Sequence, residues 1–151
     1  MAIANTIDKV LTALPVAARF ATLGSLNNLE GTMETRIFGS GKQGEDANGN
    51  VIKGGKPYSE SYAEFRRASG KQSEYIDLIF TGNLLRSIKV IEDTQGGKII
   101  FSNADGANKA EDIERKFRQV IFAATNEEAN KTFDDFERLF FVALDQELAT
   151  L

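Results

Sequence analysis

The sequence predicts an α+β fold in which long N-terminal and C-terminal helices pack on a small antiparallel β-sheet, with a long glycine-rich loop between elements. Three observations predict it. Apolar residues recur at helical spacing over residues 3–36 and again from about residue 126 to residue 148. Two short β-rich runs flank a turn sequence near residue 95. The chain has 151 residues, which suits one domain, so residues 1–151 are predicted to form a single unit.

The first helix is predicted over residues 3–36, with Asn5 or Thr6 as its N-cap. Its first apolar face consists of Ile7, Val10, Leu11 and Leu14. Pro15 is expected to interrupt or kink the helix, because the proline ring clashes with the preceding turn. Gly31 is expected to bend or end it.

Residues 39–57 contain six glycines in 19 residues, which argues against a packed element. Loops of this length are uncommon inside compact domains and usually carry a function or stay disordered. We therefore predict an extended, flexible arm within the domain. The residues predicted to form an interaction site on this arm are Gly44, Asp46, Asn48, Gly49 and Tyr58.

A short helix is predicted from Ser59 or Glu60 to about Ala68, followed by an extended run from Ile76 to Phe80. A strand from about Ser87 to Glu92, the turn sequence 93–97 and a returning strand over 98–102 predict an antiparallel hairpin.

A further helix is predicted from Lys109 to about Phe117, and the apolar run 120–124 is of ambiguous type. Thr125 and Glu128 have the spacing of a capping box, which predicts that the last helix begins here and runs to about Leu148. Its apolar stripe is predicted to be Phe133, Phe136, Phe140, Ala143 and Leu144.

The composition disfavours catalysis and cofactor chemistry. The chain has no Cys and no His, so it lacks thiolate ligands and the commonest general base. Asp46, Asn48 and Asn50 share the spacing of a calcium loop, but Val51 and Pro57 replace its glycine and its bidentate glutamate. We predict no catalytic residue, no cofactor and no metal.

The overall charge and hydropathy also narrow the class of protein. The net charge of −4 disfavours a dedicated nucleic-acid binder. No apolar run approaches the roughly 20 residues of a membrane span, and the N-terminus does not resemble a signal peptide. We expect a protein that is made and used, or assembled, in a cytoplasm.

The stretch from Leu78 to Ile88 is predicted to form a corner of strand, capped turn and strand. Thr81 can cap a turn through its hydroxyl, and Gly82 permits backbone angles that other residues resist. Leu84, Leu85 and Ile88 lie at helical spacing, so one turn of helix could bury them. Such a corner either re-aims the chain or fixes an assembly surface, and the sequence leaves both readings open.

This stretch resembles a signature of tailed-bacteriophage virion-morphogenesis proteins, the tail-completion or neck group, in which L-x-x-T-G-x-L-x-x-S-I recurs. Other segments resemble the same family in the same order: Arg36–Phe38, Gly44–Gly49, Tyr58–Ser59, Glu114–Phe117 and Ile121–Glu128. The resemblance covers roughly residues 36–130. The turn after Phe117 departs from it, because many relatives are more polar or glycine-rich there.

The resemblance implies a structural subunit of the virion neck, a head–tail connector that is assembled in the host cytoplasm and catalyses nothing. It implies a homo-oligomeric ring, a hexamer favoured over a dodecamer, which docks to other neck, connector or tail-tube proteins while DNA passes as cargo. The residues expected to hold the assembly corner are Leu78, Thr81, Gly82, Leu84, Ser87 and Ile88.

Two other functions remain as alternatives. The first is a small non-enzymatic adaptor domain that recognises its partner through residues 39–57. The second is a hydrolase using carboxylates or a Ser–Lys pair, for which Asp77, Ser87 and Lys89 are the candidate residues. It ranks last, because the sequence places no two such groups together. Within the phage hypothesis, the sequence does not separate tail completion from tail termination or head completion.

Overall fold

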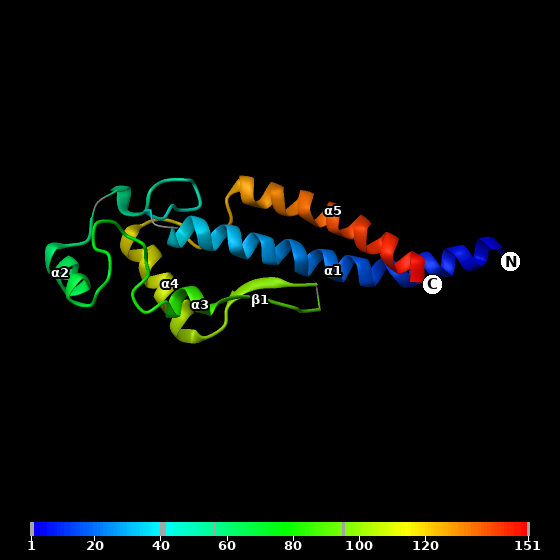
Figure 1. Cartoon of the computed structure of the whole chain (residues 1–151), viewed down its shortest axis with the longest axis horizontal. Helices are drawn as coiled ribbons and strands as arrows, with labels where there is room; N and C mark the ends of the chain where they lie inside the picture. Colours follow the sequence, from blue (N-terminus) through cyan, green and yellow to red (C-terminus); the bar gives the residue numbers. More distant parts are fainter. Residues whose placement is uncertain (1, 40–41, 56, 95, 151) are drawn as a thin grey trace.

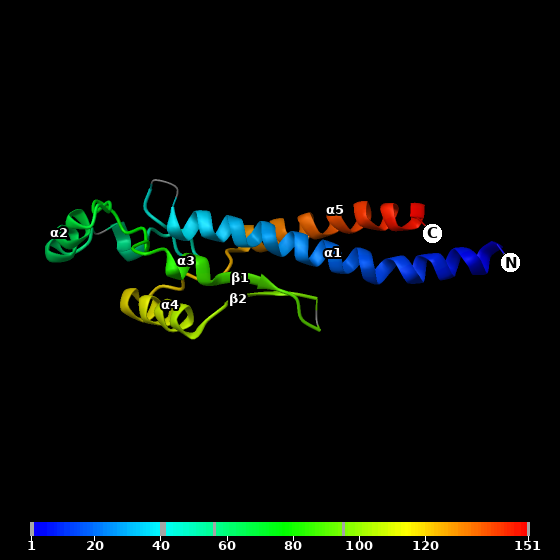
Figure 2. The ribbon, with the colours of Figure 1, turned by 60° about the horizontal axis from the view of Figure 1, so that its bottom comes forward.

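The computed structural model describes residues 2–39, 42–55, 57–94 and 96–150, so parts of the predicted 39–57 loop and of the 93–97 turn lie outside the described residues. The fold is an elongated α+β unit built along one long helix (Figure 1). Helix α1, Ala2–Phe38, runs antiparallel to helix α5, Asn126–Thr150, and a hairpin of β1, Ile88–Ile91, and β2, Lys98–Phe101, lies on the other side of α1 (Figure 2). Within the described residues, no helix is both long and apolar enough to cross a membrane.

The remaining elements lie at the C-terminal end of α1, where the chain continues into the glycine-rich loop. They form a head at the opposite end of the molecule from the two chain termini (Figure 1). They are the 3-10 turn η1, Ile52–Gly55, and helices α2, Glu60–Ala68, α3, Asn83–Ser87, and α4, Ala104–Phe117. The hairpin is antiparallel as predicted, with Ile88 opposite Phe101 and Ile91 opposite Lys98. The main core lies where the head meets α1 and includes Met33, Ile37, Ile52, Ile76, Leu84, Ile88 and Ile121.

Small side chains form the seam between α1 and α5. Ala13, Ala17, Ala21 and Ser25 recur every four residues on α1, and all four are buried. At Gly24 an added Cβ would lie 2.8 Å from Leu139 Cδ1 on α5. Gly24 therefore leaves the space that the Leu139 side chain of α5 fills, and large apolar residues of α1 lie beside the seam instead of inside it.

The structure corrects three expectations about the long helices. Ile7 and Leu11, predicted on the packed face of the first helix, are exposed, Leu11 by 61%. Phe133, predicted on the apolar stripe of the last helix, is 74% exposed. The first turns of α1 extend past the end of α5 (Figure 1), so helical spacing locates an apolar face there that no partner helix covers.

Neither Pro15 nor Gly31 interrupts α1, which continues from Ala2 to Phe38. A proline inside a helix costs about 3 kcal/mol. Pro15 faces solvent while Ala13 and Ala17 on either side of it stay packed in the seam, so tertiary packing outweighs the local penalty.

The predicted extended run from Ile76 to Phe80 is not a strand. Leu78 has φ of 52°, which breaks an extended chain, and the side chain of Asp77 accepts a hydrogen bond from the amide of Ile79 at 2.9 Å. Polar side chains therefore take the place of a sheet ladder in this segment, and the predicted corner of strand, turn and strand has a strand on one side only.

The glycine-rich loop packs more closely than predicted. Ile52 is fully buried, Glu45 and Val51 form an isolated β-bridge, and Ile52 donates its amide to the carbonyl of Gly44 at 2.9 Å. A Cβ at Gly44 would overlap the carbonyl oxygen of Ile37, so glycine is required for this close approach to the end of α1. Residues 42–55 therefore form a folded lobe of the head and not an extended arm.

The seam yields a first prediction. Replacing Ala17 by Leu inserts three carbon atoms at a fully buried position and should lower the free energy of unfolding by about 1–3 kcal/mol. Urea unfolding followed by circular dichroism measures this loss. The matched control, Lys9→Leu on the exposed side of the same helix, should leave the midpoint nearly unchanged. Equal effects of both variants would mean that the seam is not tightly packed.

Candidate assembly surfaces

The corner motif is largely a packing device. Leu84 and Ile88 belong to the core, and Ser87 is buried, where its hydroxyl donates to the carbonyl of Leu84 at 2.6 Å. A Cβ at Gly106 would overlap the Ser87 hydroxyl, so α4 starts directly against α3. These residues fix the position of α3 and β1 relative to α4.

The surface of the corner is formed by Thr81, Gly82, Asn83 and Arg86. Gly82 has φ of 75°, a left-handed conformation that suits glycine. The Thr81 hydroxyl accepts from the Asn83 amide at 3.3 Å, and Arg86 Nη2 donates to the Thr81 carbonyl at 2.8 Å. The single helical turn predicted at this corner is therefore present, and its capped start is held rigidly at the surface.

The predicted arm residues are divided between packing and surface. Asp46 is buried and its Oδ1 accepts from the amides of Asn48 and Asn50 at 2.8 and 2.9 Å, while Gln119 Nε2 donates to Oδ2 at 3.0 Å. Burial alone would raise the pKa of Asp46, but these hydrogen bonds together outweigh it and hold the pKa below its usual value. Asn48 and Gly49 are exposed at the tip, whereas Tyr58 lies in a separate cluster around Arg66.

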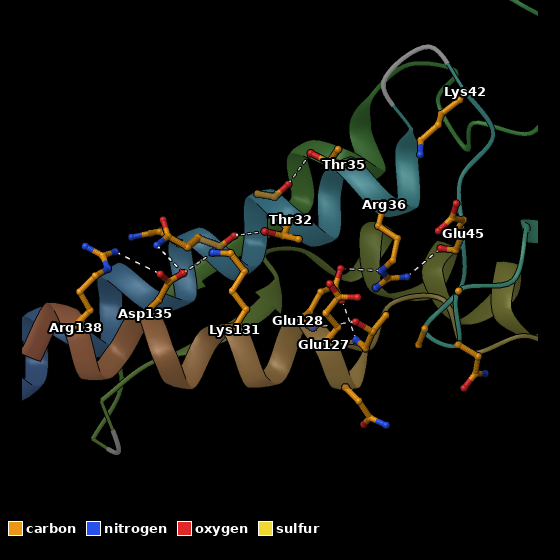
Figure 3. A pocket seen from close by; sticks show the side chains of 18 residues that line it. Thr32, Thr35, Arg36, Lys42, Glu45, Glu127, Glu128, Lys131, Asp135 and Arg138 are labelled. Atoms are coloured by element: carbon orange, nitrogen blue, oxygen red, sulfur yellow. Dashed lines mark hydrogen bonds and ion pairs between the residues drawn. The ribbon is translucent and has the colours of Figure 1, made fainter.

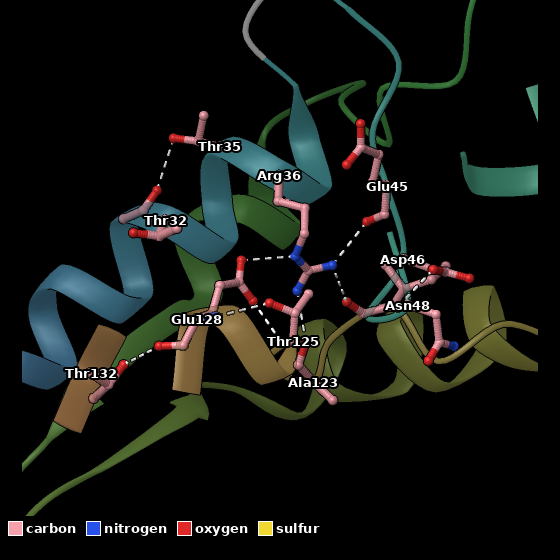
Figure 4. A network of polar contacts seen from close by, with 12 residues as sticks. Thr32, Thr35, Arg36, Glu45, Asp46, Asn48, Ala123, Thr125, Glu128 and Thr132 are labelled. Atoms are coloured by element: carbon pink, nitrogen blue, oxygen red, sulfur yellow. Dashed lines mark hydrogen bonds and ion pairs between the residues drawn. The ribbon is translucent and has the colours of Figure 1, made fainter. Parts of the chain in front are cut away.

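Arg36 connects three parts of the chain at the end of α1 (Figure 4). Its Nε donates to Glu128 Oε1 of α5 at 2.9 Å, Nη1 donates to the Glu45 carbonyl at 2.9 Å, and Nη2 donates to the Ala123 carbonyl at 2.7 Å. Nη1 also reaches the carbonyl of Ile121 at 3.3 Å. The guanidinium thus joins α1, the loop and the segment that leads into α5.

The capping box predicted at the start of α5 is confirmed and belongs to the same network. The Thr125 hydroxyl accepts from the Glu128 amide at 3.0 Å, and Glu128 Oε2 accepts from the Thr125 amide at 2.8 Å. One carboxylate therefore caps α5 and pairs with Arg36. Sequence reasoning missed the arginine, because its partners lie 9 to 92 residues away along the chain.

Removing Arg36 from this network should lower the free energy of unfolding. The side chains of Arg36 and Glu128 are 9% and 6% exposed, so Arg36→Met leaves a carboxylate buried without its cation. We expect the free energy of unfolding to fall by about 3 kcal/mol. Arg115→Met removes only exposed ion pairs and should cost less than about 1 kcal/mol. Chemical denaturation of the two variants provides the comparison, and similar losses would contradict the assigned role of Arg36.

Arg66 organises the outer part of the head in the same way. The residue is 1% exposed; its Nη2 donates to both carboxylate oxygens of Asp77 at 3.0 Å, and its Nε donates to the Gln72 carbonyl at 2.6 Å. Its Cζ lies 4.6 Å from the centre of the Tyr58 ring. The Tyr58 hydroxyl also donates to Asp77 Oδ1 at 3.0 Å. The ion pair of Arg66 and Asp77 therefore links α2 to the irregular segment before α3.

This environment gives Tyr58 an unusual titration. Burial first, and then the Asp77 carboxylate, raise the pKa of Tyr58 to about 12 from 10.0. Because the pKa is raised in the folded state, the contribution of Tyr58 to stability is complete below pH 10 and is lost as the pH rises through about 12. A phenolate absorbance titration of the three tyrosines should show one late step near pH 12, which Tyr58→Phe removes. Tyr62→Phe serves as the control and should leave the late step in place.

A broad polar groove of about 1180 Å³ separates the last turns of α1 from the first turns of α5 (Figure 3). Its lining holds four basic and four acidic side chains, so their formal charges balance. Lys131 Nζ lies 2.9 Å from Asp135 Oδ2, Arg138 Nη2 lies 3.3 Å from Asp135 Oδ1, and Arg36 is engaged with Glu128. Hydrogen bonds, first from Lys131, lower the pKa of Asp135. This groove therefore presents no strong field to a charged ligand.

The candidate groups for hydrolysis are not assembled into a site. Asp77 is neutralised by Arg66, the Ser87 hydroxyl is buried and donates to a carbonyl, and Lys89 lies exposed on β1. Among the described residues, no cluster of three or more carboxylates could hold a metal ion. The side chains available to partners are instead large and apolar: Ile7, Leu11, Val16, Phe20, Phe65, Val120, Phe133, Phe141 and Val142.

Comparison of this chain with protein-family models, with curated proteins and with solved structures finds no match. Its function must therefore be argued from the residues and surfaces themselves.

Proposed function

We propose that this chain is a structural subunit of a tailed-phage virion neck, at the head–tail junction, which assembles with copies of itself and docks to neighbouring neck, connector or tail proteins. One observation carries the proposal. The long antiparallel helices leave large apolar side chains exposed on both α1 and α5, far outside the core of the head. On α5, Phe133 and Phe141 share one side of the helix, and apolar surface gathered in this way typically marks a site of protein–protein interaction.

The resemblance of residues 78–88 to the virion-morphogenesis signature points to the same function. In that segment the turn of Thr81, Gly82 and Asn83 projects from a rigidly packed corner, which suits a contact that must be reproduced in every copy of a ring. A closed ring requires two different, matching faces on each subunit. We assign these faces to the rod of α1 and α5 and to the compact head, which are two different surfaces of the molecule (Figure 1).

The adaptor alternative receives less support from the geometry. It assigns recognition to residues 39–57, but Gly44, Asp46 and Ile52 are buried in the head. The exposed residues among those described in this stretch are Lys42, Asn48–Val51, Gly54, Gly55 and Pro57. They are mostly polar or glycine, so they offer less apolar surface to a partner than the large side chains exposed on the two long helices.

The proposal predicts a defect in particle assembly. In the phage or prophage that encodes this chain, a nonsense codon early in its gene should leave DNA-filled heads and tails that fail to join or end abnormally, while head formation and lysis proceed. Negative-stain imaging of the lysate and complementation from a plasmid measure the outcome. Infectious particles of normal appearance and number without the protein would rule out a neck function, as would a gene that lies outside any phage genome.

A further inference from the structure

A second groove lies on the head, between the segment Leu78–Asn83 and helix α4, and extends to Tyr58 and to Tyr62 of α2. It consists of two adjoining hollows of about 440 and 550 Å³, which share Leu78, Phe80, Ile113 and Lys116 in their walls. We call it the head groove. Its floor is apolar and aromatic, and the corner turn of Thr81 and Gly82 forms one end of it.

The rim of the head groove carries uncompensated positive charge. Lys116 stands over the ring of Phe117 at 5.9 Å, and Lys53 Nζ donates to the Pro57 carbonyl at 2.9 Å. In the part of the chain that the structure describes, neither ammonium group pairs with a carboxylate. The one carboxylate that lines the groove, Asp112, is engaged by Arg115 at 2.9 Å.

Backbone strain marks the same place. Leu78 lines both hollows with φ of 52°, a left-handed conformation that is strained for a leucine. The buried Arg66, which donates to the carbonyl of the next residue, Ile79, at 2.9 Å, holds the backbone there. Strain of this kind is concentrated at binding sites, where the surrounding structure maintains a shape that the local chain would not choose.

Helix α5 carries negative charge beside exposed aromatic residues, which is opposite in sign to the charge on the rim of the head groove. Phe133, Glu137 and Phe141 follow one another at four-residue spacing, so they lie along one side of the helix. Phe133 and Phe141 are 74% and 55% exposed. Asp134 and Asp145 flank them, and none of the three carboxylates forms an ion pair within the described residues. We call these five residues the α5 stripe.

We propose that the α5 stripe of one copy docks into the head groove of a second copy of this chain. This inference rests on the proposed function and names the two surfaces through which the subunits would join. Aromatic side chains enter the apolar hollows, while the carboxylates of Asp134 and Glu137 meet the ammonium groups of Lys53 and Lys116. Phe133 and Phe141 are separated by two helical turns, about 12 Å, and could fill adjoining hollows.

Charge complementarity favours docking of the α5 stripe into the head groove over docking of the other exposed surfaces of the chain. The exposed apolar residues of α1 lie on two opposite sides of the helix, Ile7 with Leu11 and Val16 with Phe20. The charges near them are Asp8 beside Lys9, and Arg19 paired with Glu92, so neither side presents an excess of negative charge to the groove. The polar groove beside α5 is internally paired. Because the stripe and the head groove are different surfaces, their contact is heterologous and propagates into a ring or an open chain.

The test uses two variants that each disable one surface. Lys53→Glu with Lys116→Glu reverses the rim of the groove, and Phe133→Ser with Phe141→Ser removes the aromatic anchors of the stripe. In sedimentation velocity and native mass spectrometry, wild-type protein should form oligomers larger than dimers. Each double variant should weaken self-association by about tenfold or more. Circular dichroism melting verifies that both variants fold.

Mixing gives the decisive result. The intact stripe of the groove variant can enter the intact groove of the stripe variant once, and the other two surfaces are disabled, so the mixture should stop at a heterodimer. A chain that combines Lys53→Glu and Lys116→Glu with Asp134→Lys and Glu137→Lys should regain self-association. Lys71→Glu and Phe20→Ser, which change an exposed lysine and an exposed phenylalanine elsewhere, should assemble like wild type.

Wild-type protein that stays monomeric at its highest attainable concentration, or double variants that assemble normally, would overturn the inference. So would a mixture that behaves as two unmixed proteins while the controls assemble. None of these results decides the neck function, which the particle-assembly experiment tests separately and which could still act through a different partner.

Discussion

The arrangement of this protein depends on the guanidinium of Arg36 at the end of α1. The guanidinium pairs with Glu128 and donates hydrogen bonds to the carbonyls of Glu45, Ile121 and Ala123. A single side chain therefore fixes the position of the loop and of the start of α5. Buried charge is stable only when its partners are complete, and here the network leaves no buried side-chain nitrogen or oxygen unsatisfied among the described residues. Since Glu128 also caps α5, the direction in which that helix departs is set by the same contacts.

With α5 packed along α1, the small residues of the seam determine which side chains are exposed to solvent. Alanine, glycine and serine of α1 leave space in which side chains of α5 such as Leu139 pack. Large side chains such as Phe20 and Phe133 lie outside this contact and are exposed. The apolar exposure that supports an assembly function is thus a direct result of the way the two helices pack.

Much of the architecture could be predicted from sequence because it is encoded locally. The hairpin, the capping box at Thr125 and the helices near residues 60–68 and 126–148 each depend on neighbours within a few positions. The helix of α4 begins five residues earlier than the predicted Lys109, because Asn103 caps it by accepting from the Gly106 amide at 2.8 Å. The long helices could be recognised, but the side each one buries could not, since that depends on matching small residues across a distance of about 120 positions in the chain.

The segments that sequence reasoning misread share one physical cause. The run from Ile76 to Phe80 has the composition of a strand, and the 39–57 loop has the composition of a disordered arm. In both, a distant arginine supplies hydrogen bonds that local propensity cannot anticipate: Arg66 reaches the carbonyl of Ile79, and Arg36 reaches that of Glu45. The head groove is equally invisible in the sequence, because Lys53, Leu78 and Lys116 come together only when these two clusters have formed.

The alanine seam also has a mechanical consequence. Alanine loses no rotamer freedom on burial and has no flexible side chain that could yield when the helices are pushed past each other. The paired part of α1 and α5 is about 37 Å long for the 25 residues of α5. Because this rod joins the head at one end only (Figure 1), a change in its angle to the head would move the far end by a distance proportional to that length.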